Sequence, residues 1–478
     1  MEKSNKLVIF LGLIFFTNLL FAQNFVDAIR LSEPGIGSNA RALGMGNAYI
    51  ALSNDFSGTF FNPAGLGLVR YGELVGSLNY NSFNNKSTLY NNTTNFSNSN
   101  TELNQFGLVL PFPVEQGSLV FSFGYNNNKD FNKAVKFDGY NPNDHSMIQD
   151  LTSYNDDLAY ELAVSYAGIS SDETIIHGQL NQSGSMLDKG GITTWTFGTA
   201  VEVAPNVYIG GTLDILGGTY KKEKEYYEDD IYNVYDNTTL TDPTLPETAD
   251  FQTFFLNDVL DWTLSGFDFK LGFLTTVKDL LNLGLVIKFP SNYSIEENYF
   301  IDGYADFAAT RFILSEPYDV TIEYDIKTPF EFMGGVAFNI MGIAIISGDV
   351  SYIDYTQMEF TEGLTPTDIS QNNKEIKQYT REVLNLSAGA EVTIPNTSLS
   401  IRGGFMYRPS PYFDDPSKYD KKYITAGVGY VAGGSIALDF AFARGWWEDF
   451  GDNYSSNLSR NYQTITVNNF TFTLTYMF

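Results

Sequence analysis

Cysteine is absent from this 478-residue sequence, and only two residues are histidine. Without Cys/His clusters at metal-ligand spacing, a zinc site is not predicted. The G-x-S-x-G nucleophile motif and the G-x-x-x-x-G-K-[ST] phosphate loop are also missing. Both histidines, His145 and His177, fall in one predicted connection between strands, so no strand presents a serine–histidine pair. We therefore expect no enzyme activity, metal or cofactor.

Positive charge is scarce: 28 Lys and Arg residues stand against 56 Asp and Glu residues, a net charge of −28. Proteins that bind nucleic acid neutralise phosphates with basic side chains, so nucleic acid is not an expected partner. The acidic stretch YYEDDIYNVYDN, residues 226–237, could hold a divalent cation. A solvated loop is the expected interpretation.

Long apolar runs are missing after the N-terminus. Residues 1–22 combine Lys3 and Lys6 with an apolar run and end in Ala22, which predicts a secretory signal peptide cut after Ala22. An uncleaved anchor helix is the alternative, but the apolar run is short for a membrane span. No later segment has 18 consecutive apolar residues, so no other transmembrane helix is predicted.

Aromatic residues and glycine are abundant, with 39 Phe, 31 Tyr and 42 Gly, and this composition favours β structure. Apolar residues alternate with polar or small ones along residues 330–340, 384–394 and 436–442. Alternation over ten or eleven residues is longer than a typical globular strand. It is the length that a tilted strand needs to cross a bilayer.

Connection lengths indicate which kind of sheet these strands form. Short turns such as APN and NIMG alternate with long polar connections at residues 83–103, 127–191, 218–265, 291–328, 355–381, 409–420 and 445–463. Predicted strands lie near residues 72–82, 104–111, 117–126, 192–204, 206–217, 266–278, 281–290, 329–340, 342–354, 382–394, 398–408, 421–431, 434–444 and 464–478. Short turns on one side and long loops on the other are typical of outer-membrane barrels.

Residues 158–168 also alternate, but a strand there would make the count odd, whereas single-chain bacterial barrels have even numbers. We assign them to the second long loop, with a helix as an option. The prediction is an all-β, 14-stranded antiparallel transmembrane barrel over residues 71–478, with long extracellular loops. It closes its last strand on its first, because an open edge in lipid leaves backbone groups unpaired.

The chain ends in FTFTLTYMF, which alternates up to Phe478. A terminal aromatic resembles the signal that outer-membrane assembly machinery reads, so Phe478 is the predicted assembly signal. The barrel-assembly machinery and outer-membrane lipid are expected partners. The alternative is an ordinary C-terminal strand of a soluble β protein.

Residues 23–70 do not alternate and are rich in Gly, Ala and Ser. A fourteen-stranded barrel has a lumen wider than its own side chains fill. We therefore predict that residues 23–70 form a hatch, a plug inside the lumen. The dipeptide Asn62-Pro63 favours a turn, because proline disfavours a helical conformation at the residue before it.

The segment GSNARALGMGNAYIALSNDFSGTFFNPAGL resembles the N-terminal hatch of the FadL/TodX (OmpP1) family of outer-membrane transporters of hydrophobic compounds. The matching features are the AR-x-x-GMG-x-A block at residues 40–48, Asp55, Asn62-Pro63-Ala64 before Leu66, RGGFMYRPSPYFDD at residues 402–415, and Phe478. Family members are fourteen-stranded barrels with a hatch, in agreement with the strand count.

The resemblance implies passive import of hydrophobic molecules, such as fatty acids or hydrocarbons, across a bacterial outer membrane. It implies a hatch or gating role for Asn62, Pro63 and Ala64, although a purely structural turn is an equal alternative. Family members release ligand sideways where the third strand kinks. The matching strand here is residues 117–126, which makes Gly124 and Asn126 the candidates for a lateral exit.

A second hypothesis comes from another class of function. Some barrels of this kind act as protein-binding adaptors in protein secretion, and the Asn- and Tyr-rich loops fit that role. A transporter should hold a hydrophobic ligand in an apolar pocket, whereas an adaptor should copurify with secretion partners.

Overall fold

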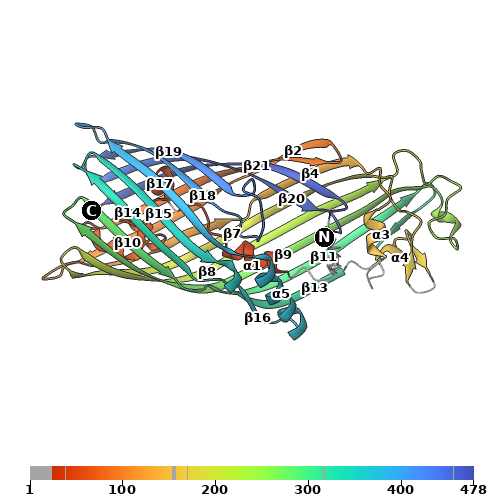
Figure 1. Cartoon of the computed structure of the whole chain (residues 1–478), viewed down its shortest axis with the longest axis horizontal. Coiled ribbons are helices and arrows are strands. Elements are labelled where there is room, and N and C mark those ends of the chain that lie inside the picture. Colours follow the sequence, from red (N-terminus) through yellow and green to blue (C-terminus); the bar gives the residue numbers. More distant parts are fainter. Residues whose placement is uncertain (1–23, 38, 153–157, 169–170, 316–317, 456) are drawn as a thin grey trace, which may run out of the picture.

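The computed structural model describes residues 24–37, 39–152, 158–168, 171–315, 318–455 and 457–478, and the predicted signal peptide lies outside them. Antiparallel strands form one closed fourteen-stranded barrel, as predicted (Figure 1). None of the described helices is long and apolar enough to span a membrane.

Several of the fourteen barrel positions are each occupied by two strands that follow one another in the sequence. The wall consists of β1 (Glu73–Leu89), β2 (Asn92–Phe112), β3 (Leu119–Asp130) with β4 (Lys133–Tyr140), β7 (Asn181–Ala204), β8 (Val207–Asp229), β9 (Phe251–Val277), β10 (Leu281–Lys288) with β11 (Asn292–Phe307), β13 (Tyr318–Lys327) with β14 (Glu331–Ile340), β15 (Ala344–Asp354), β17 (Glu382–Thr393), β18 (Leu399–Arg408), β19 (Lys421–Ala432), β20 (Ile436–Asp452) and β21 (Arg460–Met477). Short β12 (Arg311–Ile313) pairs with β11, and β16 (Glu359–Glu362) pairs with β13.

Closure joins the two ends of the barrel sequence. Strand β21 pairs with β1 from Glu73↔Met477 to Thr88↔Tyr462. Beyond this ladder the backbones of Gly72 and Phe478 exchange two hydrogen bonds of 2.9 Å each. The predicted closure is therefore confirmed, and Phe478 lies in the seam of the barrel.

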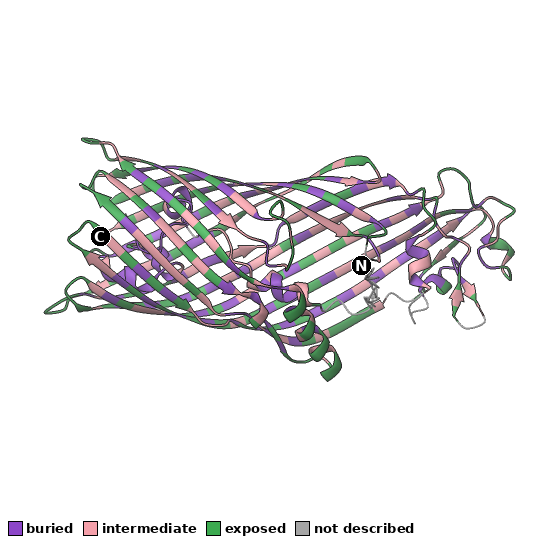
Figure 2. Cartoon of the chain, viewed as in Figure 1, coloured by how far each residue is buried: buried purple, intermediate pink, exposed green. Residues whose placement is uncertain are grey.

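The period-two pattern sets which face of each strand points outward (Figure 2). In β21, Phe470, Phe472 and Leu474 are exposed on the outer surface, whereas Thr471 and Thr473 are buried on the inner face. An apolar outer band is what hydrocarbon requires of a barrel, and a polar interior is typical of the class.

Two predicted loops are largely strand. Strands β1 and β2 continue through residues 83–103 to a two-residue turn at Tyr90 and Asn91, and β11 and β13 fill most of residues 291–328. Tyr90 and Asn91 have φ of 45° and 70°, as a tight hairpin turn requires. The prediction missed the extension of β1 and β2 because most of its side chains are polar on both faces. It missed β11 although Tyr293, Ile295, Tyr299 and Ile301 alternate as buried residues on one face of that strand.

The second long connection, predicted at residues 127–191, includes two short helices. It contains α3 (Met147–Leu151) and α4 (Leu158–Glu161), so residues 158–161 are helical, in agreement with the assignment of this stretch to a loop. Figure 1 shows α3 and α4 at the end of the barrel opposite the short turns. Helix α5 (Pro366–Tyr379) lies in a later connection, between β16 and β17.

The described part of the N-terminal segment, residues 24–70 without Ser38, packs against the inner wall. It contains α1 (Phe25–Ser32), α2 (Ala40–Gly44) and the 3-10 helices η1 (Phe56–Thr59) and η2 (Pro63–Leu68). Asn24 caps α1 by accepting a 2.9 Å hydrogen bond from the Val26 backbone. Helix α2 contacts strands β18 to β21, and η2 contacts β7, β8 and β9.

Glycines on the inner face of the wall let this segment approach closely. A Cβ atom at Gly404 would lie 2.3 Å from the Gly46 nitrogen, and one at Gly389 would lie 2.1 Å from the Met45 oxygen. We call the full set the glycine belt: Gly107, Gly124, Gly198, Gly210, Gly272, Gly284, Gly335, Gly389, Gly404 and Gly427. Eight members face one another across neighbouring strands in four pairs.

We predict that Gly404→Ala lowers the free energy of unfolding by about 1–3 kcal/mol, the usual cost of overpacking. The added methyl group would overlap the backbone of Gly46, so either the wall or the segment must shift. The matched control is Gly403→Ala, where the nearest atom is Thr425 O at 3.9 Å. Urea unfolding in detergent micelles measures both variants, and equal stability would contradict the tight fit.

Candidate functional site

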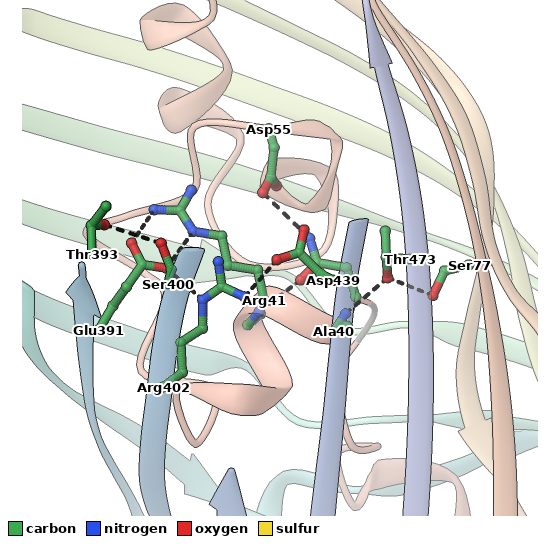
Figure 3. Close-up of polar contacts among 12 residues, drawn as sticks. Ala40, Arg41, Asp55, Ser77, Glu391, Thr393, Ser400, Arg402, Asp439 and Thr473 are labelled. Carbon is green, nitrogen blue, oxygen red and sulfur yellow. Dashed lines mark hydrogen bonds and ion pairs between the residues drawn. The ribbon is translucent and has the colours of Figure 1, made fainter. Parts of the chain in front are cut away.

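An ion-pair cluster fastens α2 to the wall (Figure 3). The Arg41 guanidinium donates two 3.1 Å hydrogen bonds to the Glu391 carboxylate on β17. Arg402 on β18 donates to the same carboxylate and to Asp439 on β20, each at 2.5 Å. Two cations and two anions thus balance one another where water is largely excluded, which is the condition under which buried charges are tolerated.

The backbone around this cluster is also held. The Ala40 nitrogen donates to Thr473 Oγ1 at 2.9 Å, and Thr425 Oγ1 donates to the Gly44 oxygen at 3.1 Å. Asp55 accepts hydrogen bonds from Asn39 at 3.3 Å and from the Tyr49 hydroxyl at 2.8 Å. The resembled residues at 40–48 and Asp55 therefore occupy one docking site.

The Asn62-Pro63-Ala64 turn is pinned in the same way. Asn62 is fully buried, and its amide nitrogen donates to the carbonyls of Ile50 at 2.9 Å and Phe273 at 3.1 Å. Its Oδ1 accepts from the Ala64 nitrogen at 3.1 Å, which starts η2. Because Phe273 belongs to β9, the turn is fixed directly to the barrel wall.

A cavity with a volume of about 640 Å³ lies inside the barrel, beside α1. Its walls include α1, the inner face of β1, the end of β3, and parts of β18, β19, β20 and β21. A volume of this size is in the range of small-molecule binding sites. Aromatic and amide side chains share its surface, among them Phe83, Phe131, Trp447, Asn81 and Asn127.

Residues 33–35 stand between this cavity and a second one of about 150 Å³, because both are lined by them. Arg408 donates to the carbonyls of Pro34 and Gly35, each at 2.8 Å, and Lys129 donates to the carbonyl of Glu33 at 2.6 Å. The Lys421 ammonium contacts the Glu33 carboxylate at 2.7 and 2.8 Å. We call residues 33–35 the partition.

The charge of Glu33 belongs to this arrangement. Burial acts to raise the pKa of its carboxyl group, but the positive charges of Lys421 and Lys129 outweigh burial and lower the pKa below its ordinary value. Glu33 is therefore ionised at neutral pH and holds Lys421 in place.

Main-chain pairing between two strands of the wall, β2 and β3, ends beside the cavity. Strands β2 and β3 pair from Phe112↔Leu119 only as far as Gln105↔Asn126, whereas β2 stays paired with β1 to Asn92 and β3 with β7 to Asp130. Beyond Asn126 side chains take over, with Asn127 donating to Glu102 and Asn98 donating to Asn132. We call this stretch the β2–β3 junction. Asn127 and Asn132 line the cavity as well.

Both residues predicted for a lateral exit lie at the edge of this junction. Asn126 is the last residue of β3 that pairs with β2, and its side chain bonds Gln105 at 3.0 Å and Thr59 at 3.2 Å. Gly124 lies two residues earlier in the glycine belt, where a Cβ would be 2.4 Å from the Phe56 ring. Neither Asn62 nor its neighbours Pro63 and Ala64 line the cavity. The functional roles assigned to these residues stay predictions.

Sequence reasoning missed Glu391 and Asp439, the two acidic partners in the wall. A signal for them existed: each is a lone charge on the inward face of an alternating strand, where small or polar neutral residues are the rule. It missed the partition as well, because Glu33-Pro34-Gly35 is an ordinary loop sequence until the lysines and the arginine that meet it are placed in space.

Comparison with known proteins defines the fold. No family model matches the sequence, and no curated protein matches it. Solved structures match it, and they show that the chain has the fold of the FadL/TodX-type outer-membrane transporters.

The Pseudomonas putida toluene transporter TodX aligns at TM-score 0.55 and 12% identity, over 93% of this chain and 99% of that one. A Pseudomonas aeruginosa FadL homologue aligns at TM-score 0.55 and 12% identity, over 93% and 98%. The CymD monoaromatic hydrocarbon channel aligns at TM-score 0.50 and 14% identity, over 93% and 98%. At these identities the likeness establishes the fold.

We predict that Arg41→Met loosens the N-terminal segment and costs about 3–5 kcal/mol, because Glu391 loses one of its two cationic partners in a buried site. Hydrogen–deuterium exchange of residues 24–70 should rise. Arg444→Met is the control, since Arg444 is exposed and its one hydrogen bond within the described residues is to Asn468, at 3.5 Å.

A second variant separates charge from packing. Adding Glu391→Gln to Arg41→Met removes the uncompensated anion and leaves Arg402 paired with Asp439, so exchange should fall back towards the wild-type level. Equal exchange in the single and double variants would show that charge balance does not hold the segment.

Proposed function

We propose that this protein is a passive channel of a bacterial outer membrane that admits hydrophobic small molecules, such as hydrocarbons or long-chain fatty acids, and releases them sideways into the bilayer at the β2–β3 junction. One observation carries the proposal: a cavity of about 640 Å³ ends against the stretch of wall where main-chain pairing between β2 and β3 stops. The neighbours in fold, which are described as a toluene transporter and a monoaromatic hydrocarbon channel, support the substrate class.

A sideways route suits an apolar ligand. Such a ligand gains nothing from an aqueous pore, because burial of apolar surface is the main favourable term available to it. Opening a continuous ladder in lipid leaves backbone groups unpaired at several kcal/mol each. Exchanging a side-chain hydrogen bond costs only about 0.5–1.5 kcal/mol net. The junction therefore opens at lower cost than a continuous ladder.

The N-terminal segment supports the same route from the inside. The partition is held by cations from three strands, and the glycine belt leaves little space between segment and wall. We propose that residues 23–70 act as a hatch that blocks the direct path along the lumen. In this proposal Asn62, Pro63 and Ala64 hold the hatch in the position that directs ligand to the junction.

Crosslinking the junction should stop transport. The natural chain has no cysteine, so Asn98→Cys with Asn132→Cys gives a unique thiol pair at two side chains that already hydrogen-bond. Joined by a short bis-methanethiosulfonate reagent, the pair should abolish uptake of radiolabelled toluene and laurate, and reduction should restore it.

The control for this experiment is a crosslink in a stretch that is already paired. Asn84→Cys with Ser97→Cys joins β1 to β2 at partners in the ladder and should leave uptake unchanged. Normal uptake through the crosslinked junction would sink the sideways route and leave only a path along the lumen.

The hatch turn gives a further prediction. Asn62→Ala with Pro63→Ala leaves the carbonyls of Ile50 and Phe273 without their donor, so the hatch should shift and uptake should fall while the barrel still assembles. Heat-modified migration on gels measures assembly, and laurate uptake measures transport. Asn298→Ala on the exposed face of β11 is the control. Normal uptake in the double variant argues for a turn with no part in transport.

A further inference from the structure

The large cavity has one apolar side. Phe83, Ile465 and Val467 form a buried cluster with Trp447 packed against it, and all four line the cavity together with Phe131. Such a surface accepts an acyl chain or a ring without polar cost. This side fits the hydrophobic ligand of the proposed function.

The other side presents buried oxygen atoms that accept no hydrogen bond. Asn81 Oδ1, Asn127 Oδ1 and Asn469 Oδ1 have no partner in the described structure, and their residues are 7%, 8% and 6% exposed. An unsatisfied buried acceptor is costly, about 1–3 kcal/mol, and so needs an explanation. Each of these amides lines the cavity, so a ligand there can reach it.

The orientation of two of these amides is fixed by neighbouring carboxylates. Asn81 donates its Nδ2 to Asp130, and Asn127 donates its Nδ2 to Glu102. An ionised carboxylate only accepts hydrogen bonds, and the only donor of an amide side chain is its nitrogen, so the free end of both amides is the oxygen. Two buried amide nitrogens of residues that line the same cavity, Asn132 Nδ2 and Asn385 Nδ2, donate no hydrogen bond in the described structure. The cavity therefore suits a ligand group that both donates and accepts, as a hydroxyl group does.

The cations around the cavity are all engaged. In the part of the chain that the structure describes, each of the five cationic side chains that line it has a protein partner. The pairs are Arg30 with Asp27, Lys129 with the Arg30 and Glu33 carbonyls, Lys133 with Asp449, Arg408 with the Pro34 and Gly35 carbonyls, and Lys421 with Glu33. A carboxylate ligand would find none of these five cations without a protein partner, and it would bring no donor to the three amide oxygens.

We infer that the preferred ligand is an uncharged amphipathic molecule whose apolar chain or ring ends in hydroxyl groups, and that Asn81, Asn127 and Asn469 select it. The inference rests on the proposed function and narrows its substrate class. Hydroxyl groups donate to the three amide oxygens while the apolar part covers Phe83 and Trp447. A site built to bond hydroxyl groups discriminates strongly against an analogue that lacks them.

Three probes that share one acyl chain test this: 1-monolauroylglycerol, laurate and methyl laurate. Titration calorimetry on the full mature chain in nanodiscs avoids glycoside detergents, which carry hydroxyl groups themselves. We expect 1-monolauroylglycerol to bind at least ~10-fold more tightly than either other probe, a modest share of the discrimination such sites reach. Equal or tighter binding of laurate or methyl laurate overturns the inference and leaves the transport proposal standing.

Variants locate the selectivity. Asn469→Leu should remove the preference for 1-monolauroylglycerol, whereas Asn469→Asp keeps an acceptor and should preserve it. Asn298→Leu, on an exposed face away from the cavity, is the control. A preference that survives Asn469→Leu and Asn127→Leu would show that these amides do not select the ligand. If none of the three probes binds, the inference fails, and the uptake of the crosslinked junction decides the transport proposal separately.

Discussion

Backbone-to-backbone contact between the N-terminal segment and the barrel wall is the constraint on which the rest of this structure depends. Ten glycines remove side chains from the inner wall where the segment passes, and only then can Arg41 reach Glu391 and Asn62 reach the Phe273 carbonyl. Because the segment is held this close, it also forms part of the lining of the 640 Å³ cavity. The position of the N-terminal segment and the shape of the cavity thus follow from one packing requirement.

The sequence predicted the barrel well because a lipid-facing wall imposes period two on every strand. Fourteen strands and closure at Phe478 were foreseeable from pattern, and parity assigned residues 158–168 to a loop rather than to a barrel strand. The hairpin of β1 and β2 was not, since in its outer half Asn, Ser and Thr residues alternate with one another and hide the period. Tertiary pairing, rather than side-chain pattern, extends those strands.

The candidate site was less predictable than the fold. A turn such as Asn62-Pro63-Ala64 has a local signature, so it was found, but its partner on β9 is 211 residues away. Four side chains bond across the β2–β3 junction: Asn98 and Glu102 on β2, Asn127 on β3, and Asn132 between β3 and β4. They have no common motif. In the sequence, polar residues of this kind cannot be distinguished from those of an ordinary strand or loop. Only the structure shows that they lie together where main-chain pairing between β2 and β3 ends, at Asn126.

Closure of the barrel between Gly72 and Phe478 is also linked to the docking of the N-terminal segment. The Ala40 nitrogen donates to Thr473, which lies 433 residues later in the chain, and Arg41 donates to Glu391 on β17. In order of synthesis, residues 40 and 41 therefore reach their final positions only when the latest strands have been made. Docking of the segment and closure of the barrel therefore become one cooperative event. A chain that ends before its final hairpin would have neither a closed barrel nor a docked N-terminal segment.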